Sequence, residues 1–207
     1  MKKLTDYKTI VVDFDGTLYY HMPVKILMFI RMAVYYFTHP HKLFELNIVI
    51  KYRRAYNNNL FESERLNILA NRFELTHDQI KKLINRWMIV IPLPYIHFFR
   101  DKLLISSLKN AQKTGVKLIV LSDHPVSEKI KVIGFTPDCA YSAEDLGVYK
   151  PNPEGLLNIF HKHGINSCDC LIIGDRMDKD GALAIKLNMD FIILSKWKCK
   201  RKKFFKE

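Results

Sequence analysis

The segment Ile10–Leu18 reads IVVDFDGTL, and it indicates the fold of the chain more clearly than any other stretch. An apolar run without alternation is typical of a strand covered on both faces of a parallel sheet. Two aspartates, Asp13 and Asp15, follow this run, and Gly16 then favours a tight turn. Two like charges in one site repel each other unless a cation neutralises them, and Mg²⁺ prefers carboxylate oxygens. The segment therefore predicts a buried strand that ends in an acidic, cation-binding site.

Apolar runs of this kind recur along the chain and alternate with helical segments. The predicted strands are Ile10–Val12, Leu118–Leu121, Ala140–Tyr141, Leu171–Ile173 and Phe191–Leu194. The predicted helices of this part are Ile96–Lys113, Ser127–Ile133, Pro153–His163 and Asp180–Leu187. Because strands and helices alternate, the expected fold class is α/β, a Rossmann-like parallel sheet flanked by helices.

The stretch from Tyr19 to Tyr95 interrupts this alternation. It contains no glycine, and its pattern predicts the helices Val24–Phe37, His41–Tyr56, Ser63–Phe73 and Thr76–Val90, the last of them capped by Thr76. We therefore expect three parts: an α/β core at residues 1–18 and 96–195, a small all-helical cap domain at 19–95, and a basic C-terminal tail at 196–207.

The segment Pro23–Phe37 is the most apolar part of this insert. It contains Lys25 and Arg31 and falls short of the ~18 uninterrupted apolar residues that a membrane span needs. We expect a helix that is largely buried or lies at an interface. The aromatic residues Phe29, Tyr35, Tyr36 and Phe37 are expected in the core of the insert.

Polar residues stand where three of the predicted strands end: Asp13, Ser122 and Asp175. Ligands of parallel sheets bind beyond the carboxyl ends of the strands, so these side chains are expected to line one crevice. Taken singly, an Asp or Ser after a strand is more often a turn or cap residue, and the Lys150-Pro151 pair is more often a surface loop.

Taken in order, however, these residues resemble the motifs of the haloacid dehalogenase superfamily. The motifs are DFDGT at 13–17, Ser122, Lys150, and Asp175 with Asp180. The resemblance extends from about residue 8 to residue 194, and the insert matches in placement and helical character only. Asp178, an additional acid in the last motif, is expected to be a solvated residue.

The resemblance implies a Mg²⁺-dependent phosphatase with a helical cap, and it assigns roles to the motif residues. Asp13 would attack phosphorus and form an aspartyl-phosphate, and Asp15 would act as general acid and then general base. Catalysis would also involve Ser122 and Lys150. The phosphate-binding residues would be Thr17, Ser122, Asp123 and Lys150, and the metal-binding residues Asp13, Asp15 (through its backbone carbonyl), Asp175 and Asp180.

Several functions remain open at this stage. Dehalogenase members of the superfamily resemble this pattern but lack an acid at the position of Asp15, so its presence favours phosphate ester chemistry. A phosphomutase would keep the same residues, and a catalytically silent binding or tethering protein on an anionic surface would keep the scaffold. An isoprenoid or other lipid-linked phosphate is an alternative to a small water-soluble phosphomonoester.

Composition narrows the partners. The formal net charge of +12 favours anionic ones, and the expected partner is a small phosphorylated metabolite. The tail KWKCKRKKFFKE, Lys196–Glu207, is either a solvated segment or an attachment to an anionic membrane surface; no specific nucleic acid is expected, because no binding fold accompanies it. Four cysteines without a metal-binding pattern and the absence of a signal-peptide pattern favour a cytoplasmic location, with peripheral membrane attachment as the alternative.

Overall fold

The computed structural model describes residues 2–195 and 201, apart from the side chain of Asn57, and it divides the chain into two compact units. The α/β unit comprises Met1–Met22 and Ile96–Glu207, and the helical unit comprises Pro23–Tyr95. The helical unit thus begins at Pro23, whereas the sequence pattern placed the start of the insert at Tyr19. The predicted tail, 196–207, lies outside the described residues except for Arg201.

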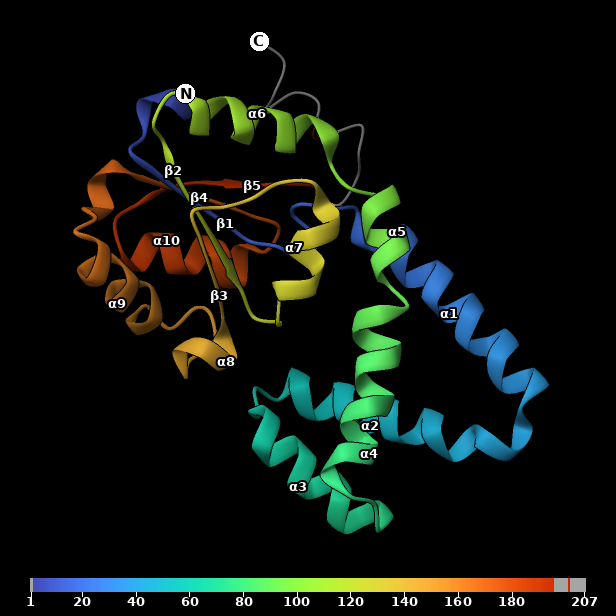
Figure 1. Cartoon of the computed structure of the whole chain (residues 1–207). Coiled ribbons are helices and arrows are strands. Elements are labelled where there is room, and N and C mark those ends of the chain that lie inside the picture. The colour runs from blue at the N-terminus through green and yellow to red at the C-terminus, as the bar shows by residue number, and fades with distance from the viewer. Residues whose placement is uncertain (1, 196–200, 202–207) are drawn as a thin grey trace. The chain divides into compact units, whose positions relative to one another are not determined.

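The α/β unit contains a parallel sheet of five strands in the order β3-β2-β1-β4-β5 (Figure 1). The strands are β1 Thr9–Val12, β2 Lys117–Ser122, β3 Cys139–Ser142, β4 Cys170–Gly174 and β5 Asp190–Ile193. The predicted α/β fold class is confirmed. Because β1 lies between β2 and β4, the residues that follow these three strands meet at the centre of one sheet edge.

Helices cover both faces of the sheet. Val11 of β1 belongs to an apolar cluster with residues of α9 (Glu154–His163) and α10 (Ala182–Lys186), among them Leu156, Ile159 and Leu183. The neighbouring residues Ile10 and Val12 are equally buried and point to the opposite face. Figure 1 shows α6 (Lys102–Lys113) on that opposite face. The uninterrupted apolar run of β1 is thus explained by burial on both sides.

One predicted helix of this unit is wrong in its bounds. Ile96–Lys113 is interrupted: α5 covers Leu93–Phe98, and α6 begins at Lys102. Asp101 caps α6, since its carboxylate accepts a hydrogen bond from the N–H of Leu104 at 3.2 Å. The backbone on either side of Arg100 pairs instead with the chain around Tyr19, as an isolated antiparallel bridge. The cap at Asp101 and this pairing replace the hydrogen bonds of a continuous helix.

The remaining predicted helices of the α/β unit are close to those observed. Here α7 covers Ser127–Ile133, a short α8 covers Ala143–Leu146, and 3-10 turns cover Leu4–Asp6 and Ser167–Asp169. The predicted helix Asp180–Leu187 corresponds to a π-helical turn at Met177–Gly181 followed by α10.

The helical unit contains no strand among its described residues. Its helices are α1 His21–Thr38, α2 Leu43–Asn57, α3 Glu62–Phe73 and α4 His77–Ile84, with a 3-10 turn at Pro40–Lys42 and a π-helical segment at Asn85–Val90. Thr76 caps α4 as predicted, its hydroxyl accepting from the N–H of Gln79. The core of this unit is made of Tyr36, Ile48, Val49, Tyr52, Leu66, Leu69, Ile80, Ile84 and Trp87.

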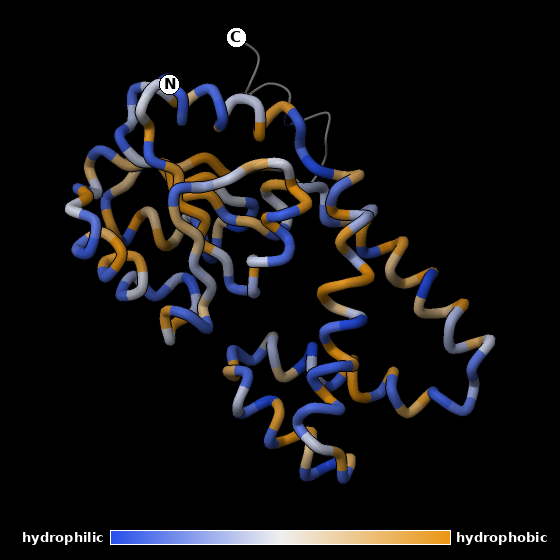
Figure 2. The backbone as a smooth tube through the Cα atoms, in the orientation of Figure 1, coloured by the Kyte–Doolittle hydropathy of each residue, from blue (hydrophilic) through white to orange (hydrophobic). Residues whose placement is uncertain are grey.

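The prediction for the aromatic residues of α1 is correct for one side of the helix and wrong for the other. Tyr36 is buried, and Tyr35 packs partly against the core. Phe29 and Phe37, however, are 74% and 88% exposed. Figure 2 shows hydrophobic residues along the length of α1. Because apolar residues occupy two opposite sides of this helix, the sequence does not indicate which side is packed.

Among the described residues, no helix has both the length and the continuous apolar character needed to traverse a bilayer.

Candidate active site

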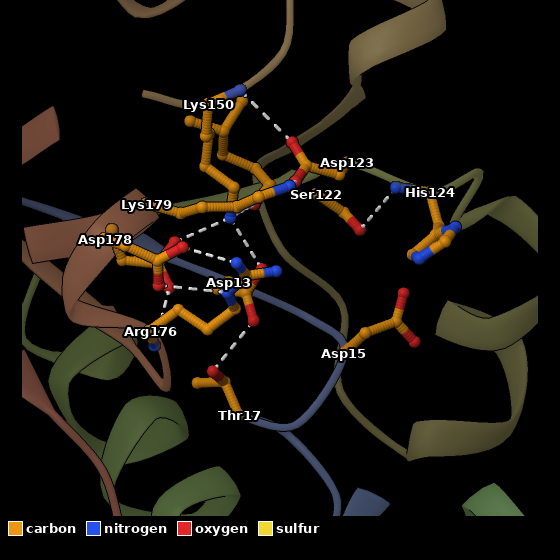
Figure 3. A network of polar contacts seen from close by, with 12 residues as sticks. Asp13, Asp15, Thr17, Ser122, Asp123, His124, Lys150, Arg176, Asp178 and Lys179 are labelled. Carbon is orange, nitrogen blue, oxygen red and sulfur yellow. Dashed lines mark hydrogen bonds and ion pairs between the residues drawn. The ribbon is translucent and has the colours of Figure 1, made fainter. Parts of the chain in front are cut away.

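The loop after β1 carries the two predicted acids in different orientations. β1 ends at Val12, so the alternation of a strand does not extend to Asp13 and Asp15. The chain turns back because the N–H of Thr17 donates to the carbonyl of Phe14 at 3.3 Å. Figure 3 shows the carboxylate of Asp15 apart from the residues grouped around Asp13.

Asp13 is buried and held from two sides. The ammonium of Lys150 donates to one carboxylate oxygen at 2.6 Å, and the hydroxyl of Thr17 donates to the other at 2.8 Å (Figure 3). Burial raises the pKa of Asp13, the Lys150 charge opposes this, and the neighbouring charges of Asp180 and Asp175 raise it further. A carboxylate in this position is therefore short of positive charge unless a further cation is bound.

Lys150 joins the two acidic segments of the site. Its ammonium also donates to Asp180 at 2.6 Å and to the carbonyl of Leu121 at 3.2 Å. Burial lowers the pKa of Lys150, but the charges of Asp13 and Asp180 outweigh burial and leave this pKa above its ordinary value. Lys150 is thus held in its charged form, with all three of its protons directed at acceptors.

Three of the predicted metal-binding residues lie close enough together to bind one cation. Oxygen atoms of Asp13, Asp175 and Asp180 lie within 4.8 Å of one another. Burial and the charge of Asp180 raise the pKa of Asp175, which indicates that carboxylates repel one another here. A set of hard oxygen ligands with uncompensated charge fits a divalent ion such as Mg²⁺.

Two glycines make room for these carboxylates. A Cβ built on Gly16 would lie 2.8 Å from the Cγ of Asp175, and one built on Gly174 would collide with the side chain of Asp180. Gly16 also has a φ of +94°, in the left-handed region that favours glycine. Gly16 and Gly174 therefore leave the space that Asp175 and Asp180 occupy.

Asp15 is the one predicted metal-binding residue whose side chain is not in the three-acid group. The ammonium of Lys129 donates to both of its carboxylate oxygens, at 2.9 and 2.8 Å, and the hydroxyl of Tyr19 donates at 2.7 Å. Burial raises the pKa of Asp15, but the charges of Lys129 and His124 and the donated hydrogen bonds together outweigh burial, so the pKa lies below its ordinary value. The metal role implied for its backbone carbonyl stays a prediction.

The predicted phosphate-binding residues lie around the same loop ends. Ser122 is buried, and its hydroxyl oxygen accepts the N–H of His124 at 3.1 Å. Asp123 accepts the backbone N–H of Lys150 at 3.2 Å and forms an ion pair with Lys179. The structure thus brings Asp13, Thr17, Ser122, Asp123, Lys150, Asp175 and Asp180 into one region. Asp178, in contrast, is exposed and pairs with Arg176.

Sequence reasoning missed several residues of this region, among them Lys129 and Arg201. Lys129 belongs to α7 and is buried against Asp15, although a lysine on a short helix carries no sequence signal of burial. Arg201 is 2% exposed and donates to the carbonyls of Gly16 and Thr17, the latter at 2.8 Å. Arg201 also pairs with Asp101 at 3.3 Å. Its neighbours Lys200, Lys202 and Lys203 are also basic, so nothing in the pattern distinguished it.

The fold, the strand-end acids and their lysine can be compared with known proteins. The family model of the haloacid dehalogenase-like hydrolases matches residues 7–187. The chain belongs to this family. A comparison with curated protein sequences found no match to this hydrolase.

Solved structures resemble the hydrolase in fold. The 2-haloacid dehalogenase of Pseudomonas syringae is similar with a TM-score of 0.66 and 19% identity, over 90% of this chain and 86% of that one. The HAD-hydrolase YfnB of Bacillus subtilis, bound to magnesium, has a TM-score of 0.63 and 15% identity, over 93% and 89% of the two chains. A HAD phosphatase of Thermococcus onnurineus has a TM-score of 0.54 and 15% identity, over 91% and 86%. At these identities, the likeness extends to the fold alone.

Proposed function

We propose that this hydrolase cleaves a phosphomonoester through a covalent aspartyl-phosphate at Asp13. The observation that carries the proposal is Asp15, a carboxylate in the same loop as Asp13 but held outside the three-acid group. An alkoxide leaving group needs a proton, whereas a halide leaves as a stable anion and needs none. An acid beside the nucleophile is therefore useful for ester cleavage and has no task in dehalogenation.

The proposed first step is attack of an Asp13 carboxylate oxygen on phosphorus. The new bond to Asp13 forms as the bond to the leaving oxygen breaks, and Asp15 donates a proton to that oxygen. In the second step, Asp15 accepts a proton from water, the resulting hydroxide attacks phosphorus, and the Asp13 carboxylate leaves with its electron pair. Inorganic phosphate and the free alcohol are the products.

The contacts of Asp15 favour its role in the second step. Lys129 and Tyr19 both donate to its carboxylate, so it is ionised in the described arrangement and ready to accept a proton. To donate a proton in the first step, Asp15 must be protonated, which requires its pair with Lys129 to open. We expect the negative charge of a bound phosphoryl group to compete with Asp15 for the Lys129 ammonium.

The other residues bind and orient the phosphoryl group. Ser122 receives a hydrogen bond from the backbone and can donate its hydroxyl proton to a phosphoryl oxygen. Lys150 keeps Asp13 in position and offsets the charge that nucleophile and phosphate bring together. Asp13 and Asp175 would hold Mg²⁺, with Asp180 beside them. When bound, the ion would neutralise negative charge on the phosphoryl oxygens and the nucleophile.

Release of phosphate from a panel of small phosphomonoesters in the presence of Mg²⁺ tests the proposal. The variant Asp13→Asn is expected to lose about 10⁴-fold in turnover, because the amide is a poor nucleophile. The exposed Asp178→Asn, in the same motif as Asp175, is the matched control and is expected to retain activity within about twofold. Unchanged turnover of Asp13→Asn, or release of halide rather than phosphate, would contradict the assignment.

The same assay distinguishes the phosphomutase alternative. A mutase returns the phosphoryl group to the product instead of transferring it to water. Phosphate would then appear slowly, while an isomeric phosphomonoester would accumulate. If neither product forms with any ester at any Mg²⁺ concentration, the result would favour the catalytically silent binding protein.

A further inference from the structure

The helix α1 is apolar on two opposite sides, and only one of them is packed. On the packed side, Val24 and Tyr36 are buried, and Met28 and Met32 are partly buried in the core of the helical unit. The other side exposes a set of large apolar side chains, here called the α1 stripe. Its members are Met22, Ile26, Phe29, Ile30, Val34 and Phe37, which are between 44% and 88% exposed.

The α1 stripe is continuous and bordered by positive charge. At about 100° per residue, its six members occupy a sector of about 140° around the helix. By the same geometry, Arg31 lies about 60° beyond one edge of the stripe, and Lys25 lies about 40° beyond the other edge, past the buried Tyr36. Both of these basic side chains are exposed. An apolar face with long basic side chains near its edges is typical of helices that lie in the plane of a membrane interface.

The charge of the surrounding segment decides between possible occupants. Residues 21–57, which form α1 and α2, contain six lysines and arginines but only one acidic residue, Glu45. A second copy of the chain would bring the same excess of positive charge against itself, so self-association through the stripe is disfavoured. An anionic lipid surface offers both an apolar interior for the stripe and negative headgroups for its basic borders.

We propose that the α1 stripe docks the protein on an anionic bilayer surface, with α1 lying in the plane of the interface. The stripe enters the boundary between headgroups and acyl chains, while Lys25 and Arg31 extend to the lipid phosphates. The packed side of α1 remains in the core of the helical unit, so docking requires no unfolding. This proposal does not depend on the reaction that the α/β unit performs.

Flotation of the full-length protein with vesicles tests this docking. One set of vesicles contains equal parts of phosphatidylglycerol and phosphatidylcholine, and the other contains phosphatidylcholine alone. The protein is expected to bind the anionic vesicles, and salt is expected to weaken the binding. The double variant Phe29→Ser, Phe37→Ser is expected to bind at least about tenfold more weakly, since two large apolar groups no longer enter the lipid.

Matched controls distinguish binding through the α1 stripe from nonspecific hydrophobic or electrostatic binding. The double variant Leu157→Ser, Ile185→Ser removes two exposed apolar residues of the α/β unit and is expected to bind the vesicles unchanged. Reversal of the border charges by Lys25→Glu and Arg31→Glu is expected to weaken anionic binding by about fivefold per residue. The charge control is Lys81→Glu with Lys82→Glu, two exposed positions on α4, for which a smaller effect is expected.

Three outcomes would overturn the proposal. One is an absence of vesicle binding by the unaltered protein at low salt. Another is equal binding by the stripe variant and the unaltered protein. The third is a dimer in solution that the stripe variant converts to monomer, which would assign the stripe to a second copy. Thermal unfolding and the hydrolysis of a soluble phosphomonoester are expected to be unchanged in the stripe variant, so loss of binding cannot be mistaken for unfolding or for an error in the proposed reaction.

Discussion

The α/β unit buries charge, whereas the helical unit exposes apolar groups. In the α/β unit, Asp13, Asp180 and Lys150 are each less than a tenth exposed, and Lys150 donates to both carboxylates. In the helical unit, Phe29 and Phe37 are largely exposed on α1. Both arrangements are costly in isolation, because buried charge needs compensation and exposed apolar surface needs a partner. This contrast underlies the two proposals: a phosphomonoester bound by the α/β unit, and a bilayer surface bound by the helical unit.

The largest effect on the reaction rate among these tests is expected at Asp15, the proposed proton donor. Asp15→Asn removes the proton donor but keeps the shape of the side chain. We expect alcohol release in the first turnover, which reports the first step alone, to slow by about 10³-fold for an alkyl phosphate and by only about tenfold for nitrophenyl phosphate, because nitrophenolate leaves without a proton. Single-turnover measurements with both esters check this. An equal slowing of the first step for the two would show that Asp15 is not the acid.

The next test concerns a buried charge that does not touch the reacting atoms. Arg201→Met keeps apolar bulk but removes the cation paired with buried Asp101 and the guanidinium donor to two backbone carbonyls. We expect the free energy of unfolding to fall by about 3–4 kcal/mol, measured in urea. Arg72→Met, on the exposed surface of α3, is the control and should change it by less than about 0.5 kcal/mol. Equal stabilities for the two variants would refute this role of Arg201.

Two adjacent residues test the two sides of α1 directly. Tyr36→Ala is expected to destabilise the protein by about 3 kcal/mol, because it opens a cavity in the core of the helical unit. Phe37→Ala is expected to change stability by less than about 0.5 kcal/mol, since that ring is exposed. Tyr36→Phe serves as a control, because the Tyr36 hydroxyl has no hydrogen-bond partner among the described residues, and we expect it to be near neutral. Urea unfolding of all three checks the contrast.

A smaller effect, dependent on pH, is expected at the Lys129–Asp15 pair. The pKa of Asp15 in the folded protein lies below its ordinary value, so the pair contributes stability at neutral pH and loses it as the pH falls. Lys129→Met should therefore cost about 2 kcal/mol near pH 7, and less below about pH 4. It should also raise the pKa of Asp15 and move the acid limb of the pH–rate profile upward.

Lys131→Met is the control for that pair, because Lys131 lies on the same helix and its ion pair with Glu128 is exposed. We expect it to leave both the stability and the pH–rate profile unchanged. A pH-independent loss of stability in Lys129→Met would show that Lys129 matters for packing and not for the charge of Asp15.

The sequence was informative wherever a residue type was tied to a strand end. Asp13, Ser122 and Asp175 were expected to converge because parallel strands present their carboxyl ends at one edge, and the structure brings them together there. Lys150 was expected from its motif alone. Lys129 and Arg201 could not be predicted, because their partners are created by tertiary packing: neither residue has a spacing that relates it to Asp15 or Gly16.

The helices show the same limit in another form. The break before α6 had a local signal, since Asp101 precedes the apolar run of that helix as a capping residue would. The sequence did not indicate the packed side of α1, because apolar residues occupy two opposite sides of the helix. That the helical unit closes over the strand-end acids, as the family resemblance implies, stays a prediction.

Gly16 and Gly174 carry no functional group, yet a single added carbon at either would strike a carboxylate that the proposed ion needs. Alanine is ordinarily the mildest replacement in a mutational scan, but at these two positions it would be among the most damaging. Substitutions that preserve every acid can therefore still inactivate the enzyme. Natural variants at positions 16 and 174 should be judged by the volume of the new side chain rather than by chemical similarity.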